Sequence, residues 1–296
     1  MADFLLAHLS DPHLGPLPSP RFDELIGKRA IGYFNWTRNR VARHATHVLD
    51  AIVADLKAQQ PQHVAVTGDL VNIALPAEFA LARNWLHTIG TPHDVTLVPG
   101  NHDAYVPSTR NLFLRAWAEY LTADGAAAAN FPFVRRRGPI ALIGVSTAVP
   151  SGPLLATGRL GAQQLKALGE TLARLDGDCF RVLLIHHPLI SSRPARYKRL
   201  IDAEQVLSII KRHGVDLILH GHDHRHSLHW IDGPAKKIPS LGVPSASAVA
   251  HGRSEPASYN LIRISRADEK WHCELTVRGF SAGSHVIREV GRRRLL

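Results

Sequence analysis

The sequence Val98-Pro99-Gly100-Asn101-His102-Asp103 is the most informative stretch of this chain. It places an amide, an imidazole and a carboxylate directly after a short apolar run that is typical of a buried strand. Four other stretches repeat this arrangement: Asp11-Pro12-His13, Gly68-Asp69-Leu70-Val71-Asn72, His186-His187-Pro188 and Gly221-His222-Asp223-His224. Because ligands of α/β proteins bind beyond the carboxyl ends of the strands, we expect these five strand ends to converge on one site.

Strand and helix patterns alternate through most of the chain. Apolar runs that predict strands precede the five stretches, and a strand pair is predicted at 133–137 and 140–145. The spacing of apolar residues predicts helices over 37–59, 76–90, 107–121, 162–175 and 203–213. Residues 15–35, rich in Pro, Gly and charge, are predicted as a long ordered loop. After Ser227, short runs without helical spacing indicate consecutive antiparallel strands.

This order of elements predicts a four-layer α/β/β/α sandwich, in which two mixed sheets pack face to face and helices flank them. Ligand candidates come from residue 11 as well as from residue 224, and no stretch has the composition of a linker. We therefore expect one domain over residues 1–296. Its motifs lie within about 4–226, and an antiparallel, strand-rich tail covers about 227–280.

The composition is that of a globular protein with an excess of positive charge. Hydrophobic residues make up 45% and charged residues 20% of the chain, which argues against disorder. The 35 Lys and Arg residues exceed the 25 Asp and Glu residues, for a net charge of +10 with the histidines neutral. This charge favours an anionic partner, such as a phosphate compound, nucleic acid or acidic lipid, without choosing among them.

Cysteine usage and apolar runs bear on the compartment. The two cysteines, Cys179 and Cys273, stand alone and form no CxxC motif, which suits a reducing environment. No apolar run reaches the length of a transmembrane helix, and Asp3 interrupts the N-terminal run where a signal peptide would need continuity. We therefore expect a cytoplasmic protein, with peripheral contact at the inner membrane surface left open.

The ligand candidates form a mixed set without cysteine. They are Asp11, His13, Asp69, Asn101, His186, His222 and His224. Seven ligands are too many for one tetrahedral zinc ion, and this set fits divalent ions such as Mn, Fe, Zn or Ni. Two ions that share Asp69 would use all seven. Ions about 3.5–4 Å apart stabilise an in-line displacement and lower the pKa of bound water toward about 7, which predicts hydrolysis at phosphorus.

The order of these motifs resembles that of the calcineurin-like metallophosphoesterase family, over residues 5–226. The shared pattern is Asp-x-His, Gly-Asp, Gly-Asn-His-Asp, His and Gly-His-x-His. The resemblance implies one metal site formed by Asp11, His13, Asp69 and His224, and another formed by Asp69, Asn101, His186 and His222. It also implies that His102 contacts the scissile phosphate and assists the leaving group, with Asp103 as its neighbour in the catalytic motif.

Two differences from the family pattern concern the substrate. Protein phosphatases of this family carry an aspartate at the position of Asn72, and arginines where this chain has Ile73-Ala74 and Ala104-Tyr105. Asparagine at this position is familiar among members similar to cyclic nucleotide phosphodiesterases. We therefore predict a dinuclear metal-dependent phosphodiesterase that hydrolyses a small anionic phosphate ester by attack of a metal-bound hydroxide, with cyclic nucleotides as the named candidates.

Other functions stay open at this point. The segment that begins at Lys28 and ends at Arg40 alternates basic and aromatic residues, as interfacial contacts do. It is similar to a loop in UDP-2,3-diacylglucosamine pyrophosphatase-like relatives, which would imply a lipid-linked substrate at a membrane surface. Packing of the aromatics onto the domain explains the segment equally well. A non-catalytic binding module is a third reading, and the complete ligand set counts against it. Nucleic acid is compatible but not favoured, because an aromatic-basic strand platform is lacking.

The remaining charged and histidine residues receive simpler interpretations. Arg135-Arg136-Arg137 and Arg292-Arg293-Arg294 are predicted as solvated surface charge. His8 and His63 are predicted as surface or strand-end histidines. His187 lies beside a ligand candidate, where support of the site and ordinary packing are equally consistent. The sequence does not determine the oligomeric state.

Overall fold

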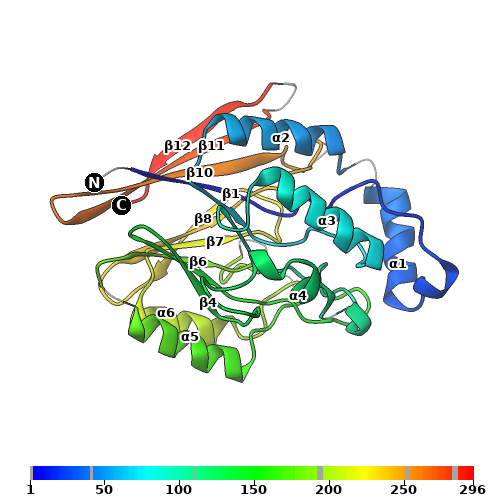
Figure 1. Cartoon of the computed structure of the whole chain (residues 1–296), viewed down its shortest axis with the longest axis horizontal. Coiled ribbons are helices and arrows are strands. Elements are labelled where there is room, and N and C mark those ends of the chain that lie inside the picture. The colour runs from blue at the N-terminus through cyan, green and yellow to red at the C-terminus, as the bar shows by residue number, and fades with distance from the viewer. Residues whose placement is uncertain are drawn as a thin grey trace.

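Two six-stranded mixed sheets face each other within the described part of the chain, and helices cover their outer faces (Figure 1). The computed structural model describes residues 3–40, 43–109, 111–175, 177–191, 196–250, 254–281 and 286–296, without the side chains of residues 39 and 40. The predicted four-layer α/β/β/α sandwich is confirmed. Among the described residues, no helix is both long and apolar enough to cross a bilayer.

The first sheet joins the N-terminal strands to the C-terminal ones. Its order is β12 (Arg288–Arg294), β11 (Lys270–Gly279), β10 (Ser258–Ala267), β1 (Phe4–Leu9), β2 (His63–Val66) and β3 (Val95–Leu97). The last three strands are parallel, and β10 to β12 continue the sheet in antiparallel pairs. The parallel pairs need crossover connections, which α2 (Thr46–Ala58) and α3 (Pro76–Ile89) provide.

The second sheet has four parallel strands between two antiparallel edges. Its order is β4 (Phe133–Arg137), β5 (Ile140–Gly144), β6 (Phe180–Leu184), β7 (Leu217–His220), β9 (Lys237–Gly242) and β8 (Ser227–Asp232). Two helices, α5 (Ala162–Arg174) and α6 (Ala203–His213), cover its outer face (Figure 1). The predicted hairpin is β4–β5, and it turns at Gly138 with a φ of 55°.

Three apolar layers hold the sandwich together. Between the sheets, Leu6 and Ile262 of the first sheet meet Leu184 and Leu219 of the second, all 1% exposed or less. Outside each sheet, the apolar faces of its two helices complete a further cluster. Side chains that are fully buried in this way contribute about 1.5–3 kcal/mol each, so the strand ends are held on a rigid frame.

Two histidines predicted at the surface or at strand ends lie in the middle layer: His63 begins β2, and neither side chain reaches the surface. Alternation along β1 turns His8 to the same side as Leu6, and pairing with Leu6 puts His63 beside it. Each ring bonds a threonine hydroxyl, His8 to Thr67 and His63 to Thr96. Burial lowers the pKa of both imidazoles to about 3, so both are neutral.

The predicted helix at 37–59 is wrong in its first part. A helix, α1 (Lys28–Asn35), occupies the end of the predicted loop, and a π-helical turn (Trp36–Arg40) follows it. Residues 41 and 42 of the predicted helix lie outside the described residues. Arg43 and Ala45 then form backbone hydrogen bonds with residues 247–249, a pairing that helical geometry does not allow, and α2 begins only at Thr46.

The predicted helix at 107–121 is broken into three short pieces. The Arg135 guanidinium donates to the main-chain oxygens of Glu119 (2.5 Å) and Thr122 (2.7 Å) at the end of the last piece. The pieces are Pro107–Thr109, α4 (Leu112–Ala116) and Ala118–Tyr120. Arg135 is therefore a buried structural group, and its prediction as solvated charge is wrong.

Of the other arginines predicted at the surface, some are buried and some are exposed. Arg137 is also buried and donates to the carbonyl oxygen of His93 and to the carboxylate of Asp124. By contrast, the arginines at 292–294 are exposed, as predicted. They lie on β12, a strand beyond the predicted tail, where Arg292 pairs with Glu289 at 2.8 Å.

Candidate metal centre

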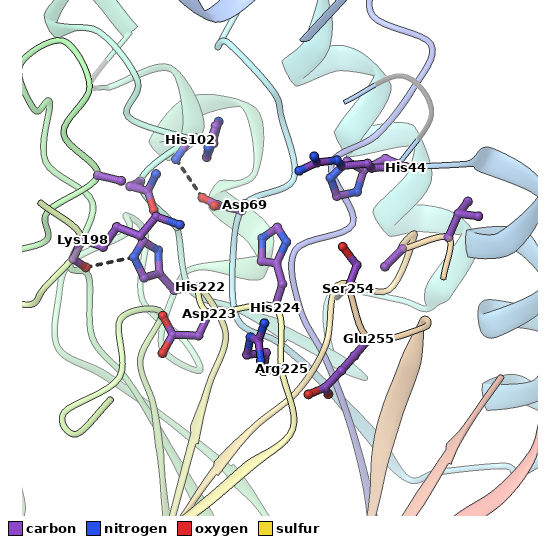
Figure 2. Close-up of a pocket in the computed structure, with 15 residues that line it drawn as sticks. His44, Asp69, His102, Lys198, His222, Asp223, His224, Arg225, Ser254 and Glu255 are labelled. Atoms are coloured by element: carbon purple, nitrogen blue, oxygen red, sulfur yellow. Dashed lines mark hydrogen bonds between the residues drawn. The ribbon is translucent and has the colours of Figure 1, made fainter. Parts of the chain in front are cut away.

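The five motif stretches meet at the adjoining carboxyl ends of β1, β2, β3, β6 and β7. Asp69, His222 and His224 point into one shared space (Figure 2). The contacts join motifs that are far apart in the chain, because His224 Nε2 lies 3.2 Å from Asp11 Oδ1 and His186 Nε2 lies 3.4 Å from Asp69 Oδ2. The predicted convergence of the strand ends is therefore what the fold produces.

The backbone at these strand ends is strained. Five ligand candidates adopt left-handed conformations: Asp11 (φ 53°), His13 (φ 40°), Asp69 (φ 56°), His222 (φ 70°) and His224 (φ 52°). This conformation costs an L-residue roughly 1–2 kcal/mol, and Asp and His tolerate it better than most. Strain concentrated in this way is characteristic of functional sites, because the surrounding structure must hold it in place.

Two glycines of the motifs are required by close approach. A Cβ at Gly100 would overlap the Asp69 carboxylate and the His186 ring. A Cβ at Gly221 would overlap the side chains of Ser10 and Asp11. Both positions therefore let the backbone run directly against the carboxylates of the site.

One donor group comprises Asp11, His13, Asp69 and His224, whose ligand atoms lie within 4.8 Å of one another. The Nε2 atoms of His13 and His224 face each other at 3.2 Å. Asp11 Oδ1 is buried without a hydrogen bond from any described residue. A cation among these atoms would satisfy all of them, so the residues fit a metal ion.

A second donor group comprises Asp69, His186 and His222, also within 4.8 Å. His186 Nδ1 donates to the Thr67 carbonyl at 2.6 Å, which leaves Nε2 for an ion and places it 3.2 Å from Asn101 Oδ1. His222 Nε2 donates to the Lys198 carbonyl at 2.9 Å, which leaves Nδ1. Asp69 belongs to both groups, as the predicted bridging role requires.

The electrostatics of the two groups suit cation binding. Burial raises the pKa of the Asp69 carboxyl, but the charges of His186 and His102 outweigh burial and hold it well below its usual range. Asp11 is shifted in the same direction, chiefly by His224 acting against burial. Burial and the neighbouring His187 hold the pKa of His222 well below its ordinary value, so this imidazole is neutral and its lone pair is available.

The orientation of His102 does not depend on an aspartate at position 72. The Nδ1 atom of its ring donates to the main-chain carbonyl of Asn72, and its backbone N–H donates to Asp69 Oδ1 at 2.7 Å. The Asn72 side chain turns away and donates to the Leu14 carbonyl at 2.7 Å. The main-chain carbonyl of Asn72, and not its side chain, therefore orients the His102 ring.

Glu78 holds this backbone in place and was missed by the sequence analysis. Its buried carboxylate accepts the N–H groups of Asn72 (2.5 Å), Ile73 (3.2 Å) and Leu75 (2.8 Å). It is the third residue of α3, and its bond to the Leu75 N–H is one half of a capping box, whose other half needs a Ser or Thr at the position of Leu75. The sequence therefore lacks the full signature that would have revealed the contact of Glu78 with the turn that carries Asn72.

Asp103, predicted as the neighbour of His102 in the catalytic motif, lies beneath the site and not at its surface. The carboxylate is fully buried and accepts the N–H groups of Asp69 (2.9 Å), Leu70 (2.9 Å) and Gly100 (2.8 Å). Burial and the nearby charge of Asp69 raise its pKa to about 7. These bonds join the β2 and β3 motifs and position them relative to each other.

Two further histidines support the centre. His44 lines the cavity, with its ring 4.8 Å from that of His13 and its Nδ1 2.8 Å from Ser247 Oγ. It belongs to no motif, so the sequence offered no signal for it. His187 is buried, bonds Thr147 and the Ala156 carbonyl, and packs against the His222 ring at 4.3 Å.

A cavity of about 490 Å³ opens above the donor groups (Figure 2). Asp69, Asn101, His102, His222 and His224 line its floor. Its walls carry the cationic side chains of Arg43, Lys198 and Arg225 and also the carboxylates of Asp223 and Glu255. The three cations beside a metal centre can contact an anionic ligand such as a phosphate ester.

Comparisons with known proteins agree with this geometry. The sequence pattern of the calcineurin-like phosphoesterase family matches residues 4–226. A probable cyclic nucleotide phosphodiesterase of Synechococcus sp. is 27% identical over 231 residues, which cover 76% of this chain and 80% of that relative.

Two solved structures share the fold. A dimetal phosphatase from Danio rerio superposes with a TM-score of 0.62 at 13% identity, over 97% of this chain and 99% of its own. Purple acid phosphatase PPD1 of yellow lupin (Lupinus luteus) superposes with a TM-score of 0.61 at 13% identity, over 97% of this chain. This chain spans 53% of the lupin enzyme.

Proposed function

Because the chain belongs to the calcineurin-like phosphoesterase family, we propose that it is a dinuclear metal-dependent phosphodiesterase. The observation that carries this proposal is the pair of donor groups that share Asp69 beneath a polar cavity. The substrate class is a small anionic phosphate ester. The resemblance to a probable cyclic nucleotide phosphodiesterase supports cyclic nucleotides as candidates.

The seven ligand candidates keep the roles predicted from the sequence. Asp11, His13, Asp69 and His224 would hold one ion, and Asp69, Asn101, His186 and His222 the other. Two divalent ions of the Mn, Fe, Zn or Ni kind supply charge stabilisation at phosphorus and acidify bound water when present. The backbone bonds of His186 and His222 fix which ring nitrogen each of them offers.

His102 would act on the leaving group. A bond forms between the oxygen of water and phosphorus while the bond from phosphorus to the ester oxygen breaks, and the departing alkoxide needs a proton. With Nδ1 bonded to the Asn72 carbonyl, the His102 ring is held at the cavity to donate that proton or a hydrogen bond. Asp103 is a positioning residue in this scheme.

We expect the enzyme to prefer diesters to monoesters. The positions beside the motifs where protein phosphatases place arginines hold Ile73 and Ala104, which are apolar and at most 2% exposed, so a monoester dianion gains no extra cation there. The measurement is kcat/KM of the manganese-loaded protein for bis(p-nitrophenyl) phosphate and for p-nitrophenyl phosphate, with cyclic nucleotides and UDP-diacylglucosamine beside them. A higher kcat/KM for the monoester would contradict the proposal.

The structure weakens the case for a lipid-linked substrate, because two of the cations between Lys28 and Arg40 form hydrogen bonds within the protein. Arg29 is buried and donates to the Ala74 carbonyl at 2.6 Å, and Lys28 donates to the Ser151 hydroxyl at 2.9 Å. These cations are used inside the protein. The side chain of Arg40 lies outside the described residues. Peripheral membrane contact through this segment and a cytoplasmic location both remain predictions.

Replacing Glu78 with glutamine is expected to lower kcat roughly 10- to 100-fold while KM and bound metal change little. The amide accepts fewer of the three N–H bonds, so the Asn72 carbonyl and with it the His102 ring lose their position. Steady-state kinetics and metal analysis check this result. The matched control is Glu204→Gln, an exposed glutamate in the first turn of α6. If kcat falls equally in the two variants, Glu78 does not position His102.

A further inference from the structure

A second cavity, of about 500 Å³, adjoins the one above the donor groups. Asn101, His102, Ala156 and Lys198 line both. Asp69, His222 and His224 line the first cavity and not the second. The two cavities are therefore halves of one groove that meet at Asn101 and His102, and Asn101 is the one proposed metal ligand that also borders the second half.

The walls of the second cavity carry large apolar side chains that face solvent. Their exposed fractions are 46% for Ile31, 56% for Phe34, 80% for Leu154, 42% for Leu155 and 52% for Tyr197. They come from three separate segments of the chain and gather here. A cluster of exposed apolar groups marks a surface that binds an apolar partner. We call these five residues the apolar lobe.

The exposed Leu154 has a strained backbone. Its φ of 62° lies in the left-handed region, which is unfavourable for leucine by roughly 1–2 kcal/mol. At 80% exposure the side chain gains little from packing in return. A strained and exposed leucine at the edge of a cavity points to a ligand that covers it.

Hydrogen bonds hold the segments of the apolar lobe in place beside His102. Lys28 Nζ donates to the carbonyls of Ser151 and Leu155, both at 3.1 Å, and so ties α1 to the 151–155 loop. The Ala156 N–H donates to the Tyr197 carbonyl at 2.7 Å, which joins that loop to the third segment.

An aromatic ring continues the lobe to the proposed acid. Lys28 Nζ also lies 4.4 Å from the Tyr105 ring centre, and that ring stacks on His102 at 5.3 Å. Lys28 therefore links the loop that carries Leu155 to Tyr105, and the Tyr105 ring reaches His102.

We propose that the apolar lobe binds the leaving alcohol of the substrate, and that this alcohol carries an aliphatic chain. The inference rests on the proposed function. A phosphate above the metal ligands would have its leaving oxygen at His102, where the halves of the groove meet. When the bond from phosphorus to that oxygen breaks, the oxygen takes a proton from His102, and the freed alcohol lies against the apolar lobe. The substrate is then a phosphodiester of one aliphatic alcohol and one polar alcohol, in place of a cyclic nucleotide, whose two ester oxygens belong to one ribose.

The test measures binding of n-alkylphosphonates, from ethyl to octyl, to the manganese-loaded full chain by isothermal titration calorimetry. These probes present the phosphonate to the metal centre and a chain of graded length to the apolar lobe, and they are not hydrolysed. We expect Kd to fall about two- to fourfold for each added methylene, since a fully buried methylene is worth about fourfold. Hydrolysis of bis(p-nitrophenyl) phosphate is measured beside it.

A double variant, Leu154→Asn with Leu155→Ser, should flatten this series while leaving ethylphosphonate binding unchanged. Asparagine accepts the left-handed backbone at 154 better than leucine, so the fold is not at risk there. The control is Leu81→Gln, because Leu81 is 48% exposed on α3 and lines neither cavity. That variant should retain the full dependence on chain length.

The outcomes separate this inference from the proposed function. If Kd of the wild-type protein does not change with chain length, or if the double variant shows the same change as the wild type, the apolar lobe does not bind the chain. Either result overturns this inference even where the diester is hydrolysed. If Kd falls with chain length but the protein hydrolyses neither nitrophenyl ester, the apolar lobe is supported as a binding site and the proposed phosphodiesterase function is contradicted. Co-sedimentation with phosphatidylglycerol vesicles together with a flat series would assign these side chains to a membrane surface, against the proposal.

Discussion

Replacing Asp69 with alanine is expected to remove both metal ions together and to abolish hydrolysis. Asp69 is the residue that the group of Asp11, His13 and His224 shares with the group of His186 and His222, and its Oδ2 lies 3.4 Å from His186 Nε2 and 3.9 Å from His13 Nε2. Each group would lose a ligand and its shared negative charge at once. The loss should exceed the 10- to 100-fold that follows removal of an outer-sphere partner of a metal ligand.

Metal analysis after loading and desalting checks this expectation. The matched control is Asp223→Asn, which changes a carboxylate of the same cavity that belongs to neither donor group and accepts a bond from Ser191. The control should retain two equivalents of metal. Two equivalents retained by Asp69→Ala would show that the ions are held elsewhere, and the ligand assignment would fail.

Replacing His102 with alanine is expected to separate chemistry from metal binding. His102 belongs to neither donor group, and its Nδ1 is bonded to the Asn72 carbonyl, so both coordination spheres should survive. We expect a loss of roughly 10²–10⁴-fold in kcat for a substrate with a poor leaving group, the range typical of a general acid. The loss should be much smaller for nitrophenolate, which departs without a proton.

The comparison therefore uses two diesters that differ only in the leaving alcohol, such as nitrophenyl and alkyl esters of one phosphate. Bound metal is measured on the same samples. Equal losses for the two esters would exclude proton donation and leave stabilisation of the transition state as the role of His102. Loss of one ion would make His102 a ligand.

The strand-end motifs could be located in the sequence because they obey local rules. An apolar run such as that before Asp69 has the length and composition of a buried strand, and the polar residues after it fall at the carboxyl end of that strand. Parallel strands bring those ends to one edge of a sheet. The seven ligand candidates and His102 were therefore identified without knowledge of the contacts among them.

The residues that position the site could not be found in the same way. Arg135 is buried because its guanidinium satisfies carbonyls of a segment folded over it, and a run of three arginines has the same local appearance on a surface. Glu78 and Asp103 hold the motifs through backbone N–H groups, and each of these bonds depends on how a loop bends. Helix boundaries failed for a related reason, since residues 43–45 pair with 247–249.

The periodicity of apolar residues and the order of the motifs were thus sufficient for the α/β/β/α sandwich and for the metal-binding chemistry, because both arise from short-range patterns that repeat along the chain. The apolar lobe, the charged wall of the first cavity and the place of His44 beside His13 were decided by the tertiary structure alone. Their residues come from segments far apart in the sequence, and only the packing of the two sheets and their loops brings those segments together.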